Sequence, residues 1–174
     1  ILEYQETMIV QAVKDGNFEL FKEVVEAGYA MESELQFNNG MAWSRGVCGC
    51  LDIIDWLHIQ YKTNIGHNEI MAGAAYGGHI DVIQYLYAKE FIAERDVILD
   101  YACNAGHLYM VEWLVKNKMI ISEYSLINAV KSGNLDLCKW LFERGGEVKN
   151  SIESSVADTH LHITIWLIDE VKVV

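Results

Sequence analysis

Two cysteines separated by one glycine offer the clearest opportunity for chemistry in this chain. Cys48 and Cys50 flank Gly49, and two histidines, His58 and His67, follow downstream. Thiolates and imidazoles suit zinc, but zinc sites usually separate paired cysteines by about two to four residues and require a second ligand pair. The sequence shows neither feature. We therefore expect no metal and no cofactor, and we interpret Cys50 as a structural residue.

The histidines that follow glycines do not form a catalytic pattern. His79 and His107 each come directly after a glycine at the same position of a repeat, whereas a catalytic histidine is expected once, beside a nucleophile. We expect these rings to hydrogen-bond the backbone of a neighbouring unit. The motifs Gly-x-Ser-x-Gly, Gly-x-x-x-x-Gly-Lys and His-Glu-x-x-His are absent from the sequence. The sequence therefore predicts a protein that is not an enzyme, with no catalytic residues.

Composition and charge narrow the class of partner. The 174 residues are 52% hydrophobic and include 13 basic and 25 acidic side chains, for a net charge of −12. This charge disfavours nucleic acid, which is bound through lysine and arginine clusters. An acidic surface favours a basic partner protein, while a simpler interpretation is that the charge keeps the protein soluble. No apolar run reaches the roughly 18 to 20 residues that span a bilayer, so we expect no membrane partner.

A glycine that precedes an apolar helix recurs along the chain. The anchors are Gly16, Gly49, Gly78, Gly106 and Gly133, with Thr159 in the equivalent place at the end, at intervals of 33, 29, 28, 27 and 26 residues. Apolar residues two, four, five and eight positions after each anchor trace one face of a helix. The pattern predicts a helix beginning after each glycine.

A shorter helix is predicted before each anchor. An apolar residue stands seven positions before the anchor, and a small residue usually stands four before it, which lets neighbouring helices approach closely. The anchor glycine can then adopt the left-handed conformation that ends a helix. Since no unit can bury its apolar stripe alone, the units must stack. We predict an all-α protein, an α-solenoid of about six helix-turn-helix repeats, over a single domain, residues 1–174.

Large aromatic residues occupy one position of the repeat. Trp56, Tyr85, Trp113, Trp140 and Trp166 all stand seven residues after an anchor. A ring repeated at one helical position favours packing between repeats over a ligand cage. If Trp140 is buried in this way, its replacement by alanine should cost about 3 to 5 kcal/mol.

Two segments carry a resemblance to a known family. Residues 104–114, Asn-Ala-Gly-His-Leu-Tyr-Met-Val-Glu-Trp-Leu, and 131–141, Lys-Ser-Gly-Asn-Leu-Asp-Leu-Cys-Lys-Trp-Leu, resemble the inner loop and second helix of ankyrin repeats. The aromatic residue at position seven resembles a subtype common in large DNA viruses and their protist hosts. The later units are shorter than the typical ankyrin period, so β-hairpin fingers should be mostly shortened or absent. Only residues 28–40 are long enough for a full finger.

The second unit departs from the pattern. Arg45 stands where the other units carry alanine or serine, within Ser-Arg-Gly-Val-Cys-Gly-Cys. A buried arginine needs a partner, so either the helix ends early and Arg45 reaches solvent, or Arg45 pairs with a carboxylate. We expect the early helix end.

The resemblance places partner binding on the concave face formed by the first helices and the loops before them. The exposed position of that face, two residues before each anchor, holds Lys14, Val47, Tyr76, Asn104, Lys131 and Ala157. Tyr76 is the strongest candidate because tyrosine is enriched at interface hot spots. Trp43 is either an exposed binding residue or a space-filling one. The predicted partner-binding residues are Trp43, Val47, Tyr76, Asn104 and Lys131, together with Arg95 from a predicted loop.

The sequence therefore predicts a protein–protein interaction module, which by analogy with viral arrays recruits host or substrate proteins. The alternative is a structural spacer of a longer array or particle with no partner of its own. An end in Val173-Val174 without a polar cap favours a piece of a longer array. Four cysteines without a disulfide-rich pattern indicate a reducing, cytoplasmic compartment, which is the host cytoplasm if the protein is viral.

Overall fold

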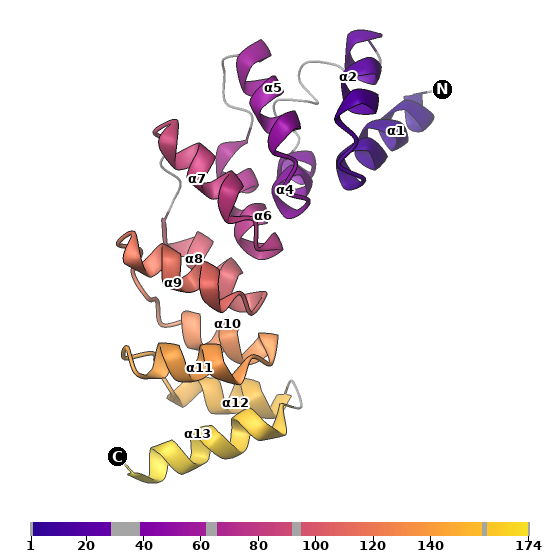
Figure 1. Cartoon of the computed structure of the whole chain (residues 1–174). Helices are drawn as coiled ribbons and strands as arrows, with labels where there is room; N and C mark the ends of the chain where they lie inside the picture. Colours follow the sequence, from indigo (N-terminus) through magenta and orange to yellow (C-terminus); the bar gives the residue numbers. More distant parts are fainter. Residues whose placement is uncertain (1, 29–38, 62–65, 92–94, 158–159, 174) are drawn as a thin grey trace. The chain divides into compact units, whose positions relative to one another are not determined.

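The computed structural model describes residues 2–28, 39–61, 66–91, 95–157 and 160–173, and all regular structure in these ranges is α-helical (Figure 1). The expectation of an all-α fold is confirmed. The first helices of the repeats are α1 (Leu2–Lys14), α4 (Asn39–Val47), α6 (His67–Gly77), α8 (Arg95–Asn104), α10 (Ser125–Ser132) and α12 (Lys149–Ala157). The second helices are α2 (Phe18–Glu26), α5 (Leu51–Tyr61), α7 (Ile80–Ala88), α9 (Leu108–Lys116), α11 (Leu135–Phe142) and α13 (Leu161–Val173).

The helices of the described residues form two compact units, with three helix pairs in each. The first unit comprises Ile1–Ala93 and the second Glu94–Val174. The predicted single domain over residues 1–174 stays a prediction. Most of the predicted hairpin finger at residues 28–40, and the last anchor Thr159, lie outside the described residues. Within the described part, none of the helices combines the length and apolar character that a bilayer span requires.

The anchor glycines turn the chain between the helices of a pair as predicted. Gly16, Gly49, Gly78, Gly106 and Gly133 have φ angles of 62, 65, 80, 78 and 75°. This left-handed conformation lacks a steric penalty only for glycine, and it lets the last amides return to helix carbonyls. The Gly78 amide, for example, donates to the carbonyl oxygen of Ala74.

The predicted apolar face of the second helices is buried. The residues four, five and eight positions after the anchor are all buried in five of the six units. In the first unit, the residues five and eight positions after the anchor are buried, and the residue four after it is half-buried. Position two is only half-buried, and at Leu161 it is exposed. The small residues four before the anchors are buried too. The buried residues of the second helices are Phe21, Val24, Val25, Ile53, Ile54, Leu57, Val82, Ile83, Leu86, Met110, Val111, Leu114, Leu137, Cys138, Leu141, Ile163, Thr164 and Leu167.

The aromatic residues at position seven pack between repeats, but they are half-buried rather than buried. Trp56 meets Phe21 of the preceding pair edge to face at 6.1 Å, and Trp166 meets Phe142 in the same way at 5.5 Å. Tyr85 donates a hydrogen bond of 2.5 Å to Asp55. The premise that Trp140 is buried is wrong. Its ring is half-buried, and the Arg144 guanidinium lies 3.8 Å from the ring centroid.

Replacing Trp140 with alanine is therefore expected to lower the free energy of unfolding by about 1 to 2 kcal/mol, well below the cost of a buried tryptophan. The neighbouring Leu141 is fully buried. Its replacement by alanine should cost about 3 kcal/mol. Urea unfolding of both variants tests the difference, and a Trp140 variant as destabilised as the Leu141 variant would contradict it.

In the irregular second unit, the first helix does not end where the sequence predicted. Helix α4 continues through Arg45 to Val47, and the Arg45 side chain is fully buried, so the expected early helix end is wrong. The helix does not stop at Gly46, because the residue in the left-handed conformation is Gly49. Burial disfavours the charged guanidinium and lowers the pKa of Arg45 to about 10.

Candidate functional site

The six candidate residues lie in both units and differ in accessibility. Tyr76, with 42% of its surface exposed, and Lys131 are exposed, whereas Trp43, Val47 and Asn104 are half-buried. Arg95 is the first residue of α8, so the expectation that it lies in a loop is wrong, and its side chain is outside the described residues. We describe the candidates of each unit separately.

In the first unit the structure brings Trp43 and Tyr76 together. Their ring centroids lie 5.7 Å apart, with the ring planes inclined at 44°. Trp43 belongs to α4 and Tyr76 to α6, the first helices of consecutive repeats. The sequence analysis treated the two residues as independent candidates. They instead form one aromatic pair, half-buried on the tryptophan side and exposed on the tyrosine side.

Three glycines set the spacing of the helices that carry this pair. A Cβ atom on Gly46 would collide with the carbonyl oxygen of Ile70, one on Gly73 with that of Trp43, and one on Gly77 with that of Val47. Real Cβ atoms are not found so close to backbone atoms, so α4 and α6 can approach this closely only through glycine. The spacing Gly73-x-x-x-Gly77, which places both glycines on one helix face, is the sequence signal that would have revealed this contact.

Ring and amide nitrogens after the anchors link consecutive repeats, which confirms the prediction for His79, while that for His107 stays a prediction. His79 Nε2 lies 3.0 Å from the carbonyl oxygen of Val47, and donates to it in the tautomer protonated at that nitrogen. Asn134 Nδ2 donates to the carbonyl oxygen of Gly106 at 2.8 Å, and His160 Nε2 lies 3.2 Å from that of Lys131. The backbone carbonyls of Val47 and Lys131 are thus engaged within the repeats, so a partner would meet these candidates through their side chains.

Cys50 holds the same position as these residues and acts in the same way. Its thiol donates to the carbonyl oxygen of Val13 at 3.0 Å. Burial raises the pKa of the Cys50 thiol to about 12, so the sulfur is protonated at neutral pH. Among the described residues, no group of three or more His, Cys, Asp or Glu side chains is arranged to hold a metal ion.

His58 and His67, which the sequence offered as ligands, belong to an aromatic cluster. His67 stacks on Phe91 with ring centroids 3.6 Å apart and planes 14° apart, and His58 meets Phe91 edge to face at 5.2 Å. His67 is buried. Its burial, with a smaller effect of nearby His58, lowers its pKa to about 4. His67 is therefore neutral at pH 7 and serves packing.

In the second unit, a carboxylate connects consecutive first helices. Asp100 of α8 accepts hydrogen bonds of 2.9 Å from both Ser122 and Ser125 hydroxyls, just before and at the start of α10. Asn104 and Lys131 lie at the other ends of the same two helices. Within the described residues, no contact joins the Asn104 and Lys131 side chains into a pair like Trp43 and Tyr76, and these two candidates remain separate predictions.

Comparisons with known proteins agree with this architecture. Residues 70–154 match the family of ankyrin repeats (three copies). Two ankyrin repeat proteins of Acanthamoeba polyphaga mimivirus are similar, one at 30% identity over 105 residues (58% of this chain) and the other at 24% over 133 residues (73%). The chain covers only 16% and 29% of the lengths of these two proteins. The crystal structure of the human ASB11 ankyrin repeat domain superposes with a TM-score of 0.66 at 18% identity, over 92% of this chain and 82% of that one.

Proposed function

Since this chain is an ankyrin repeat protein, homologous to the ankyrin repeat proteins of mimivirus, we propose that it binds a partner protein through the exposed face of its first helices. Ankyrin repeat domains are generally protein-interaction modules and typically non-catalytic. The face proposed here corresponds to the concave face of ankyrin arrays.

The Trp43–Tyr76 pair is the observation that carries the proposal. Tryptophan and tyrosine are the residues most enriched at interface hot spots, because they bury a large area at a small cost in conformational entropy. Here the close contact of α4 and α6 fixes both rings before a partner arrives, so little ordering cost remains. Val47, half-buried near the end of α4, adds apolar surface to the same pair of helices.

Charge and homology define the kind of partner we propose. The net charge of −12 favours a partner with a basic surface. Such a partner associates with the acidic chain faster, and acidic proteins that compete for the same face are repelled. Both mimivirus homologues are viral proteins. On this basis we propose that the partner is a host protein that the array recruits.

Replacing Tyr76 with alanine is expected to weaken partner binding about thirtyfold, corresponding to roughly 2 kcal/mol for a hot-spot tyrosine. The test is capture of partners from an amoeba lysate on the immobilised chain, followed by affinity measurement on the captured protein. Tyr109 provides the matched control, because it is an exposed tyrosine on the second helix α9. The Tyr109→Ala variant should bind normally. Equal capture by the Tyr76→Ala variant and the unmodified chain would overturn the proposal.

A spacer role is the second candidate, and exposed apolar residues in the last helix pair favour it. Val156, three residues before the last anchor position, is 62% exposed, whereas the equivalent residues of the other units, such as Val13 and Val130, are fully buried. Leu161 and Ile165 of α13 are also exposed. Such a face suits stacking of a further repeat. A chain that captures no protein through Tyr76 or any other first-helix residue would support this role over partner binding.

A further inference from the structure

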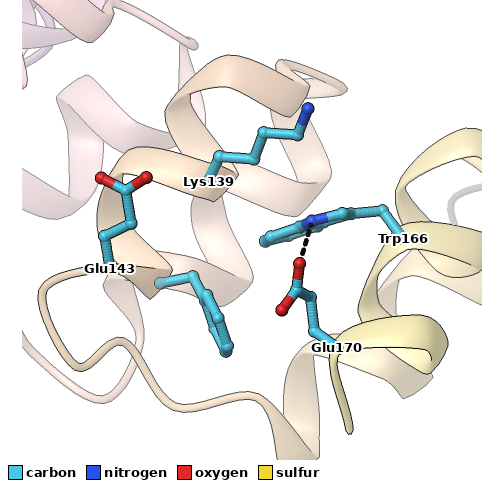
Figure 2. Close-up of a pocket in the computed structure, with 5 residues that line it drawn as sticks. Lys139, Glu143, Trp166 and Glu170 are labelled. Atoms are coloured by element: carbon cyan, nitrogen blue, oxygen red, sulfur yellow. Dashed lines mark hydrogen bonds between the residues drawn. The ribbon is translucent and has the colours of Figure 1, made fainter. Parts of the chain in front are cut away.

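A groove lies between the second helices of the last two repeats, α11 and α13, entirely within the second unit. It has a volume of about 410 Å³ and is lined by Lys139, Phe142, Glu143, Trp166 and Glu170. Figure 2 shows Lys139 and Glu143 on one side and Trp166 and Glu170 on the other. Its walls are thus two aromatic rings, two carboxylates and one ammonium group.

The aromatic part of the groove is fixed by its own contacts. Phe142 meets the Trp166 ring edge to face, with centroids 5.5 Å apart and planes at 85°. The indole Nε1 of Trp166 donates a hydrogen bond of 3.1 Å to Oε1 of Glu170, drawn as the dashed line in Figure 2. A carboxylate is therefore held at the edge of a half-buried indole ring. A cation over the ring would meet both the negative face of the indole and this carboxylate.

Two other repeats show that a ring at this position can hold a cation. In two other repeats the aromatic residue seven after the anchor carries a cation from the residue four positions further on. Arg144 lies 3.8 Å from the ring centroid of Trp140, and Lys89 lies 5.4 Å from that of Tyr85. In the last repeat the ring is Trp166 and the residue four further on is Glu170. The last repeat thus supplies a carboxylate where the other two supply a cation.

We propose that the groove of Phe142, Glu143, Trp166 and Glu170 binds the cationic side chain of an arginine or lysine from a partner protein. The cation takes the place over the indole that Arg144 takes over Trp140, and the negative charges of the Glu170 and Glu143 carboxylates attract it. Glu143 also lies 3.6 Å from the Arg144 guanidinium, so Glu170 is the stronger partner of the two. The net charge of −12 favours approach of a basic segment.

Lys139 is expected to weaken the binding of a cation in the groove. It is exposed at the rim of the groove, and its ammonium group repels an incoming cation. Its removal therefore strengthens binding, whereas removal of a carboxylate weakens it. If the groove bound only apolar side chains, its affinity would change neither on removal of Lys139 nor on removal of a carboxylate. The site is independent of the Trp43–Tyr76 pair, since the two are built from different units of the chain.

Titration of the whole chain with short peptides tests the proposal. The probes are acetyl-Gly-Arg-Gly-amide, its lysine version and its neutral citrulline version, and the readout is the indole N–H signal of Trp166 in ¹H–¹⁵N spectra, assigned with a Trp166→Phe variant. The expected result is a saturable shift with the arginine and lysine peptides and none with the citrulline peptide. The relative strength of the two cationic probes distinguishes an arginine site from a lysine site.

Variants complete the experiment. Glu170→Gln should weaken binding of the cationic peptides about tenfold, Glu143→Gln less, and Lys139→Ala should strengthen it several-fold. Glu112→Gln is the matched control, since it removes one exposed carboxylate of α9 and leaves the groove intact. Three results would each overturn the proposal: no Trp166 shift at 10 mM peptide, an equal response to the citrulline peptide, or a Glu112→Gln effect as large as that of Glu170→Gln. The Glu143→Gln variant removes one negative charge but leaves the Trp166–Glu170 hydrogen bond in place. Its effect on binding therefore reports the loss of charge without any displacement of the indole ring.

Discussion

Replacing Gly73 with alanine lowers the free energy of unfolding by about 3 kcal/mol. This value already includes the roughly 1 kcal/mol by which alanine stabilises a helix relative to glycine. The added Cβ would collide with the carbonyl oxygen of Trp43, and its next neighbours would be the backbone of Val47 and Gly46. Backbone atoms cannot rotate away as a side chain can. Helix α4 must therefore move away from α6, and the buried surface between the two helices is partly lost.

The same displacement separates Trp43 from Tyr76, so the Gly73→Ala variant should also capture the partner less well than its remaining stability alone would suggest. Gly145 provides the control. It has a φ angle of 89°, but a Cβ there would meet nothing within 4 Å. Gly145→Ala should cost only the roughly 1 kcal/mol of a left-handed alanine. Urea unfolding measures both variants. If Gly73→Ala is as stable as the unmodified chain, α4 and α6 do not make this contact.

The protein loses stability as the pH falls from 6.5 to 4, because His67 must be neutral to remain packed. The pKa of His67 is about 4 in the folded chain and 6.5 for an unperturbed histidine. Between these values the unfolded chain binds more protons than the folded chain, so stability is fully present above pH 6.5 and falls toward pH 4. For this single group the expected loss between pH 7 and pH 4.5 is about 2 kcal/mol.

Comparison with His67→Phe isolates this contribution from the carboxylates that titrate in the same range. Phenylalanine preserves a ring against Phe91 and cannot be protonated, so the variant should lose about 2 kcal/mol less than the unmodified chain between pH 7 and pH 4.5. His162→Phe is the control, because His162 is exposed and lies outside the cluster. Identical pH profiles of the unmodified chain and the His67→Phe variant would show that His67 is not buried as a neutral ring.

The candidate site was only partly predictable. The sequence predicted exposed side chains two residues before each anchor, and the structure confirms this for Tyr76, whereas Val47 and Asn104 at the same position are half-buried. It could not show that Tyr76 meets Trp43, since contact between residues 33 positions apart depends on how closely two helices approach. Arg95 was expected in a loop and begins α8 instead. Helix ends depend on neighbouring contacts, which no short segment contains.

The sequence by itself determined the register of the repeat. The position of each anchor glycine, the start of each second helix and the buried stripe behind it follow from backbone sterics and the helical period, which act within a few residues. The tertiary structure decided how deeply each side chain is buried. Arg45 is fully buried and Trp140 is only half-buried, although the pattern alone favours the reverse. Burial depends on neighbours supplied by other repeats: glycines admit α6 against α4, whereas Trp140 has the Arg144 guanidinium of its own repeat over its ring. The same dependence leaves Trp166 with a carboxylate at its edge, and so creates the groove proposed to take a cation.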